Sequence, residues 1–466
     1  MASSGSTAAP VFSKGYRTWL LFMLLLTNAF NLADRQQIAA VAQAIKQDLR
    51  LTDSEIGMIL GLGFAIFYTL LGLPLARMAE HMNRAKIISV SLAIFGAMSA
   101  LCSTAQGFWR LLLFRVGVGV GDAGFGPPVA SLIGDHYPEE KRASINSIIW
   151  LGAPIGVVFG SFFGGWLAEH VSWRAAFVAI GVPAFLLSIL AFTTLREPPR
   201  GMSDRRPTGS GPPPSTWVVL TFLLGKPSMR HILIGCGLAA TAMNAIGQFL
   251  GQFLVRSFHI GLAQAGALLG TLAGAAMASG LALGGFGVDW AGRFDKRWYV
   301  WGPALGLAVA APMFVLGFGQ ATLVSTIAVL MAGHVVLFIY YTPTLAMAQN
   351  MVGANMRASS AFAVAVVLGL VGIGLGPTLV GFLSDAFARH AFTSGKFEEL
   401  CGKGAAVYGP LFTEECGRAS AAGLRHALVA MSLLLLWAAL HYLLAARNLR
   451  RDLDTHYEPE AALAAR

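Results

Sequence analysis

The sequence predicts an all-α polytopic membrane protein, in which twelve transmembrane helices form two six-helix halves related by pseudo-symmetry. Three observations predict this fold. Of the 466 residues, 56% are hydrophobic and only 12% are charged, whereas a soluble domain carries about 25% charged residues. Apolar runs of about 18 or more residues, each long enough to cross a bilayer, recur along the chain. Motifs of the first half also return in the second half at a nearly constant distance.

The apolar runs and the turn residues between them set the limits of the spans. The segment 196–228 is polar and rich in Pro and Gly, which is typical of a linker. The predicted parts are a tail over 1–16, an N-terminal bundle over 17–195, the linker, a C-terminal bundle over 229–446 with an outer loop at 389–423, and a tail over 447–466. The expected spans are 17–46, 55–79, 85–104, 108–135, 143–170, 173–195, 229–256, 262–288, 298–317, 322–349, 358–388 and 424–446.

Lys and Arg are distributed unequally between the two sides of these spans. With both termini inside, the cytoplasmic segments hold 21 of the 33 basic residues and the outer segments hold ten, while the other two lie within spans. Cytoplasmic loops of membrane proteins carry an excess of basic residues. We therefore expect a multi-pass protein of the inner (cytoplasmic) membrane with both termini in the cytoplasm. Because the basic residues sit in short loops, the net charge of +10 does not indicate a nucleic-acid partner.

Spans one and four contain four charged residues at bilayer depth. Asp34 and Arg35 lie near the middle of span one, and Arg115 and Asp122 share one face of span four, two turns apart. Each such charge costs at least about 2.5–3.5 kcal/mol, so it is expected to face a cavity and to be paired. Two acids and two bases could form a network that rearranges. The alternative is a static cluster that only holds the helices together.

Uncharged polar residues mark three spans as possible walls of a cavity. In span one, Asn28 and Asn31 lie on the same stripe as Arg35, and in span seven Asn244, Gln248 and Gln252 repeat every four residues. Span ten offers His334 and Tyr341 as weaker candidates. A hydrogen bond between helices explains His334 as well as a cavity does. The predicted substrate-binding residues are Asn28, Asn31, Asn244, Gln248, His334 and Tyr341.

The two halves repeat each other at three places, which implies the same topology in each. Span five also carries Gly156, Gly160 and Gly164 at four-residue spacing, which is typical of close helix packing at the interface between halves. The repeated residues are Arg142-Ala143-Ser144 and Arg357-Ala358-Ser359 at an offset of 215, Gly160, Gly165 and Glu169 with Gly376, Gly381 and Asp385 at 216, and Glu80 and Arg84 with Asp289 and Arg293 at 209.

The loop after span eight has a sequence that points to a family. It reads Gly285-Phe-Gly-Val-Asp289-Trp-Ala-Gly292-Arg293 and resembles the signature loop of the major facilitator superfamily, Gly-x-x-x-Asp-x-x-Gly-Arg. The first copy, around Glu80 and Arg84, departs from this pattern because Glu replaces Asp and both glycines are absent. The resemblance implies that Glu80, Arg84, Asp289 and Arg293 form charge clasps between helices, which act as gating loops.

Five further segments resemble the Spinster-like branch of that superfamily, mainly in the N-terminal half. The most branch-specific element is the Asp-Arg pair at 34–35. The segments are Asn31-Leu-Ala-Asp34-Arg35-Gln36, Leu70-Leu-Gly-Leu-Pro74-Leu-Ala-Arg77, Arg115-Val-Gly-Val-Gly-Val-Gly-Asp122-Ala-Gly124, Ser172-Trp-Arg-Ala-Ala-Phe177 and Arg196-Glu-Pro-Pro-Arg-Gly201.

This resemblance implies a secondary transporter that works by alternating access and is linked to protons. Asp34 is the candidate proton carrier, with Arg35, Arg115 and Asp122 as its partners. The branch also implies an amphipathic or lipid-like substrate such as a lysophospholipid. Transport of small organic metabolites or drugs is the alternative, followed by a non-transporting receptor and a lipid-modifying enzyme on the same fold. We expect a monomer in the lipid bilayer.

The sequence offers no motif for other chemistry. It contains no phosphate-binding Gly-x-x-x-x-Gly-Lys-Ser/Thr loop, no Cys/His cluster with metal spacing and no apparent Ser-His-Asp arrangement, so we expect no cofactor, no metal and no enzyme activity. Cys401 and Cys416 both lie in the predicted outer loop, on the side where disulfides form. The sequence leaves open whether they are bonded.

Overall fold

The computed structural model is a bundle of long helices, and it describes residues 12–137, 145–146, 148–199, 202, 216–352, 357–401 and 410–454. Eleven helical segments among these residues are long and apolar enough to cross a membrane. Helix α1 (Lys14–Leu49) supplies the twelfth crossing, because its 36 residues span about 54 Å. Its polar stripe and its charges lower its hydropathy below that of the others. The predicted fold class is confirmed.

The N-terminal half has six crossings, of which two are interrupted. Gly61 separates the two helices of the second crossing, and a short turn separates those of the fourth. The helices are α1, α2 (Asp53–Leu60) with α3 (Leu62–His81), α4 (Arg84–Cys102), α5 (Phe108–Ala123) with α6 (Gly126–His136), α8 (Gly152–His170) and α9 (Trp173–Thr194).

The C-terminal half repeats this order with more interruptions. The helices are α11 (Pro227–Phe258), α12 (Leu262–Ala282) with η1 (Leu283–Gly287) and α13 (Val288–Ala291), α14 (Trp298–Phe318), α15 (Leu323–Leu337) with η2 (Phe338–Tyr340) and α16 (Tyr341–Asn350), α17 (Arg357–Val366) with η4 (Val367–Leu375) and α18 (Gly376–Ala391), and α20 (Pro410–Asp454). The short helices α10 (Thr216–Gly225) and α19 (Phe397–Leu400) lie between crossings.

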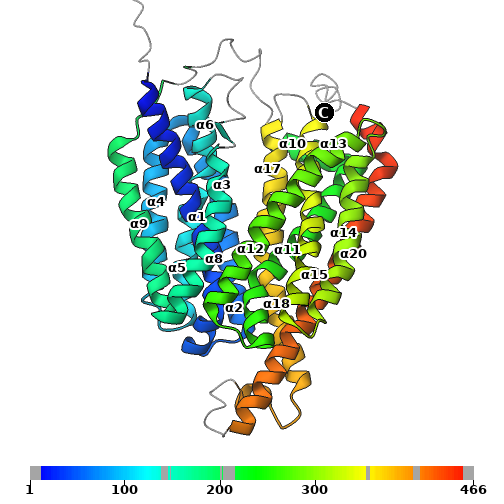
Figure 1. Ribbon diagram of the computed structural model, residues 1–466. Helices are drawn as coiled ribbons and strands as arrows, with labels where there is room; N and C mark the ends of the chain where they lie inside the picture. Colours follow the sequence, from blue (N-terminus) through cyan, green and yellow to red (C-terminus); the bar gives the residue numbers. More distant parts are fainter. Residues whose placement is uncertain are drawn as a thin grey trace, which may run out of the picture.

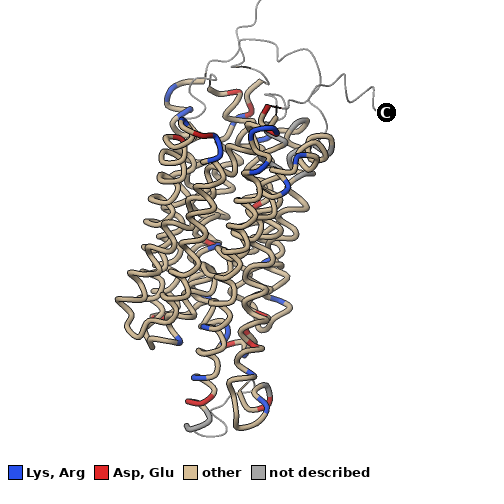
Figure 2. The backbone as a smooth tube through the Cα atoms, turned by 90° about the vertical axis from the view of Figure 1, so that its right-hand side faces the viewer, with Lys and Arg blue, Asp and Glu red and all other residues tan. Residues whose placement is uncertain are grey.

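Two faces of the bundle can be distinguished (Figure 1). We call the face where α1 begins and α20 ends the terminal face, and the opposite face, which carries α19, the loop face. The two halves separate toward the terminal face and meet toward the loop face. Figure 2 shows that Lys, Arg, Asp and Glu gather at these two faces, with few charges between them.

Two predicted irregular segments are partly helical. The linker 196–228 contains α10, whose Val219 and Leu223 are fully buried, so only its earlier part is polar. The outer loop 389–423 is shorter than predicted, because α20 begins at Pro410 and runs for 45 residues, about 68 Å. Both helices were missed because one is too short to span a bilayer and the other leaves the apolar region.

Small residues allow α8 to lie directly against α1. A Cβ atom at Gly156 would overlap the carbonyl oxygen of Ala29, and one at Gly160 would overlap that of Ala33. Backbone atoms cannot move aside as a flexible side chain can. The glycine spacing therefore holds Ala33 and the neighbouring Asp34 at a fixed distance from α8.

The same kind of contact joins the two halves near the loop face, and it occurs twice. In the first copy, Gly57 of α2 lies against the Pro377 carbonyl of α18, and Gly381 of α18 lies against the Asp53 carbonyl. In the second copy, α12 and α8 exchange the equivalent contacts, Gly266 to the Ser161 carbonyl and Gly165 to the Leu262 carbonyl. These pairs follow the repeat offsets, so the interface between halves is itself pseudo-symmetric.

We expect Gly160→Ala to lower the free energy of unfolding by about 1–3 kcal/mol, because the new methyl group must push α8 away from α1. Gly247→Ala is the matched control, since a Cβ at that helical position meets nothing within 4 Å. Thermal unfolding of the detergent-solubilised protein measures both. Equal unfolding midpoints for the two variants would contradict the close packing.

Candidate functional site

The four charged residues inside the N-terminal half come together as two ion pairs between α1 and α5. Arg115 Nη1 donates to Asp34 Oδ2 at 2.5 Å, and Arg35 is bonded to Asp122. Ser99 of α4 also donates to Asp34, at 2.5 Å. The pairing is crossed, so each acid takes the arginine of the other helix and Asp34 does not pair with its neighbour Arg35.

The two pairs differ in their access to the surroundings. The side chains of Asp34 and Arg115 are 0% and 2% exposed, whereas that of Arg35 is 21% exposed. Its guanidinium lies over the rings of Phe64 and Tyr68, with its central carbon 4.5 and 4.8 Å from the ring centres. Aromatic faces attract a cation while leaving its N–H groups free to bind an anion.

The asparagines of span one are buried and do not join this cluster through hydrogen bonds. Asn28 donates to the Ile149 carbonyl at 3.0 Å and thus connects α1 to the start of span five. Asn31 is 3% exposed, and its side-chain oxygen has no hydrogen-bond partner among the described residues. Asn28 is therefore engaged in helix packing, while the side-chain oxygen of Asn31 is available to accept a hydrogen bond.

In the C-terminal half, the candidates divide into two groups. Tyr341 is half-buried and lies near Arg35 and Tyr68 of the other half. Gln248 is also half-buried, and its side-chain oxygen has no partner among the described residues. Asn244 instead donates to the Ala240 carbonyl of its own helix.

His334 lies away from this group. Its Nδ1 contacts the Leu330 carbonyl at 2.7 Å, and its ring packs edge-to-face against Phe314 of α14. Both partners belong to the C-terminal half. These contacts favour the packing interpretation of His334 over a place in the cavity.

At the terminal face of the N-terminal half, the predicted clasp residue Arg84 has several partners. Arg84 is 1% exposed and bonds to Asp135 at the end of α6, and its Nε donates to Glu197 at 2.6 Å. Glu197 also accepts from the Arg84 backbone at 2.8 Å. The side chain of Glu80 lies outside the described part of the structure. This copy departs more from the family signature, yet its arginine has the denser set of partners.

The second copy is organised differently. Arg293 is exposed, and Asp289 accepts from the Tyr299 hydroxyl at 2.7 Å. The ion pair at this end joins Asp295 to Arg450 of α20, at 2.8 Å. Among the described residues, Asp289 and Arg293 therefore form no ion pair with each other, and Arg293 has no equivalent of the acidic partners of Arg84.

A second charged cluster, which the sequence analysis did not anticipate, closes the loop face. We call it the latch: Asp53 of α2 accepts from Lys46 at 2.6 Å and from both terminal nitrogens of Arg256 at 2.7 Å. Ser384 of α18 donates to the same carboxylate at 2.6 Å. Asp53 is 1% exposed. Because Arg256 and Ser384 belong to the C-terminal half, the latch ties the halves together.

Two carboxylates extend the latch in a pseudo-symmetric way. Asp385 of α18 accepts from the backbone nitrogens of Asp53 and Ser54, at the start of α2. Glu169 of α8 accepts from the Ala263 nitrogen, at the start of α12. A helix N-terminus carries unpaired N–H groups and partial positive charge. Each half thus caps a helix of the other half.

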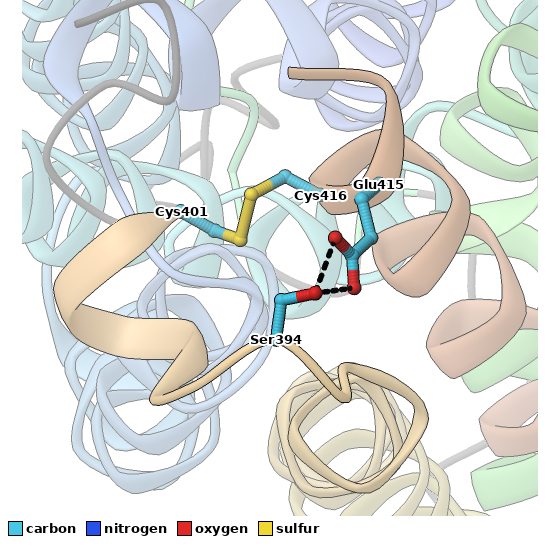
Figure 3. The surroundings of a disulfide bond; sticks show 4 residues. All are labelled: Ser394, Cys401, Glu415 and Cys416. Carbon is cyan, nitrogen blue, oxygen red and sulfur yellow. Dashed lines mark hydrogen bonds between the residues drawn. A yellow bond between two sulfur atoms is a disulfide. The ribbon is translucent and has the colours of Figure 1, made fainter. Parts of the chain in front are cut away.

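A disulfide joins Cys401 and Cys416, the pair whose bonding the sequence left open (Figure 3). It connects α19 to the outer part of α20, and Ser394 donates to Glu415 beside it at 2.7 Å. Cys401 and Cys416 line one cavity of about 560 Å³ together with Lys46 of the latch and with Ser54 and Asp385 beside it. The outer hairpin is therefore anchored directly over the latch.

Sequence reasoning found the central charges but missed their surroundings. The sequence indicates only that Lys46 and Arg256 are basic residues of outer segments and that Glu197 lies in the linker. The repeat match of Glu169 with Asp385 was the one available signal that these acids share a role. Phe64, Tyr68 and Ser99 carried no local signal, because ordinary core residues have the same pattern.

Comparisons with known proteins agree with this architecture. Residues 22–390 match the Major Facilitator Superfamily. An MFS-type efflux pump of Mycolicibacterium smegmatis is 28% identical over 371 residues, which cover 79% of this chain and 85% of that protein. Protein spinster homolog 1 of Rattus norvegicus is 28% identical over 250 residues, 53% of this chain and 47% of that protein. The chain thus matches about half the length of the rat relative.

A solved structure covers nearly the whole chain. It is the crystal structure of a bacterial homologue of the human lysosomal transporter Spinster, in an inward-facing and unoccupied conformation. It is 31% identical and covers 96% of this chain and 100% of its own, with a TM-score of 0.85. The chain therefore belongs to the Major Facilitator Superfamily as a Spinster-like member, and it is a multi-pass membrane transporter and not an enzyme.

Proposed function

We propose that this transporter moves an amphipathic, lipid-like substrate such as a lysophospholipid by alternating access, and that transport is linked to protons. The observation that carries the proposal is the pair of crossed ion pairs between α1 and α5, one of which leaves its arginine accessible. The substrate is a small molecule, and we propose that the working unit is a monomer in the inner membrane with both termini in the cytoplasm.

Asp34 is the proposed proton carrier because it is fully buried against Arg115. Protonation removes its charge and leaves a buried arginine without a counterion, which is strongly unfavourable at this depth. The protein then gains free energy by adopting a conformation in which Arg115 reaches water or another partner. A proton on Asp34 would in this way shift the equilibrium between two conformations.

Arg35 is the proposed contact for the substrate head group. It is the most accessible of the four charges, and it is held between aromatic rings of α3 and near Tyr341 of the other half. A phosphate or carboxylate group matches the fork of donors on an arginine. Asn31 and Gln248, each with an unpartnered side-chain oxygen, are proposed to bind uncharged donors of the substrate.

The closed latch supports a proposal for the side of the membrane toward which this conformation is open. The halves meet at the loop face and separate toward the terminal face (Figure 1), and the solved Spinster homologue is inward-facing. If both termini are cytoplasmic, this chain is likewise open to the cytoplasm. The transport cycle then requires the latch to break and the terminal face to close.

A second candidate function is export of small organic metabolites or drugs. The Mycolicibacterium relative is an efflux pump, which favours this function, and that relative matches more of this chain than the rat Spinster protein does. Both candidates use the same proposed proton carrier, so the choice between them depends on the substrate.

Uptake of a labelled lysophospholipid into proteoliposomes is expected to follow an imposed pH gradient, and Asp34→Asn is expected to abolish that dependence. Asn has nearly the same shape but cannot take up a proton. Asp48→Asn is the matched control on the same helix, since Asp48 lies at its exposed end and pairs with Arg174 at 2.6 Å. Gradient-dependent uptake that persists in Asp34→Asn would exclude Asp34 as the carrier. No uptake by folded protein under any gradient would exclude the lipid substrate and favour small metabolites or drugs.

Arg35→Lys is expected to raise the KM for an anionic or zwitterionic substrate about tenfold, because lysine keeps the charge but loses the planar contact with Phe64 and Tyr68. Arg35→Gln should raise it further. Arg110→Lys, at an exposed arginine bonded to Gln106, serves as the control and should leave the KM unchanged. Initial uptake rates over a range of substrate concentrations give these values. An unaltered KM in Arg35→Gln would show that the head group binds elsewhere.

A further inference from the structure

We propose that the loop face carries a separate binding site for a phosphate-bearing ligand, in an open groove between the end of α11 and the outer part of α20. The groove has a volume of about 950 Å³, at the upper end of the range of small-molecule sites. Its lining residues come from the end of α11 and from the first turns of α20, and the outer part of α20 extends beyond the other helices (Figure 1). None of its residues belongs to the central cluster of charges.

Four of the ten residues that line this groove are basic. Arg418 and Arg425 stand seven residues apart, hence on one face of α20, and Arg256 and His259 face them from the end of α11. Glu414 is the one acid among the lining residues. It lies 3.9 Å from Arg418, and since both side chains are about 70% exposed, this pair is weak. Arg425 is exposed and forms no ion pair with any described residue.

The exposed guanidinium groups of Arg418 and Arg425, with His259 opposite them, are suited to a phosphate monoester. Such a group carries up to two negative charges and three terminal oxygens, so it can accept paired hydrogen bonds from more than one arginine. A carboxylate has one charge and two oxygens, so it would leave some of the arginine N–H groups without an acceptor. The site would accept the phosphate of an amphiphile or inorganic phosphate, and these two sources have to be separated by experiment.

Arg256 connects this groove to the latch. Its side chain is 6% exposed and holds Asp53 with both terminal nitrogens, yet it also lines the groove. The N–H donors of Arg256 are all engaged, by Gln43, Gln252 and Ser420 as well as Asp53. A phosphate bound by Arg418 and Arg425 would therefore have to displace Asp53 to bind Arg256. Binding would weaken the contact that ties the halves at the loop face. The role of this weakening in transport rests on the alternating-access function proposed above, whereas phosphate binding itself can be measured without transport.

Isothermal titration of the full-length protein in detergent, with inorganic phosphate and with octyl phosphate as probes, tests the site. We expect saturable binding that weakens at least tenfold in the double variant Arg418→Gln/Arg425→Gln. The control Arg110→Gln/Lys396→Gln removes the same number of exposed positive charges from the loop face outside the groove, and it should bind like the wild type. Tighter binding of octyl phosphate assigns the site to amphiphiles, and equal binding assigns it to the free anion. Absence of saturable binding, or equal loss in both double variants, would overturn the proposal.

Two latch variants with opposite expected effects test the competition. Asp53→Asn removes the carboxylate that competes for Arg256 and should tighten phosphate binding several-fold. Lys46→Gln leaves Arg256 as the only remaining cationic partner of Asp53 and should weaken binding. Thermal unfolding shows that each variant is folded, and either variant alone suffices if the other is not. Unchanged affinity in a folded variant would disprove the link between groove and latch.

Discussion

The structure depends above all on the cost of placing charges where water does not reach. Asp34, Arg115 and Asp122 are almost fully buried, and each is held by an opposite charge on another helix. Since an unpaired charge at this depth would cost several kcal/mol, α1 and α5 are fixed in register by their side chains. The glycines of α8 then hold α1 from the other side. In the proposed mechanism, the release of one of these charges would thereby be coupled to the packing of three helices.

Charged and polar contacts also hold the loop face together, but there they join the two halves. Under the alternating-access mechanism proposed above, the two halves would adhere in one conformation and separate in another, so a large apolar contact would be unsuitable. Glycines instead bring backbones into contact, and carboxylates on α8 and α18 bind the first N–H groups of α12 and α2. Such contacts are directional and are exchanged readily for water. The latch around Asp53 has no counterpart in the other copy, where the equivalent position is Leu262. The pseudo-symmetry is therefore broken where the halves are tied most tightly.

The sequence predicted the fold and the central charges but not how they pair. Hydropathy and the repeat offsets define the crossings, because a bilayer permits few alternatives. The partners of Arg35 and Arg115 could not be derived, since helix rotation decides them and the sequence allows either choice. Likewise Glu197, Lys46 and Arg256 look like ordinary residues of polar segments. Glu197 and Arg256 meet partners that lie 113 and 203 residues away in the sequence. The contact of Lys46 with Asp53, seven residues on, depends on how the turn between α1 and α2 folds. Helical segments outside the membrane, such as the first turns of α20, lack the apolar pattern that reveals the others.

The length of α20 has a mechanical consequence. This single helix passes from the terminal face through the C-terminal half and continues outward to the disulfide between Cys401 and Cys416. A continuous helix of this length is stiff, so a small tilt of the C-terminal half moves its outer end through a larger arc. The disulfide-braced hairpin on that end follows the same arc. When the C-terminal half rotates in the membrane, the disulfide-braced hairpin would thus move farther than the membrane-spanning helices do.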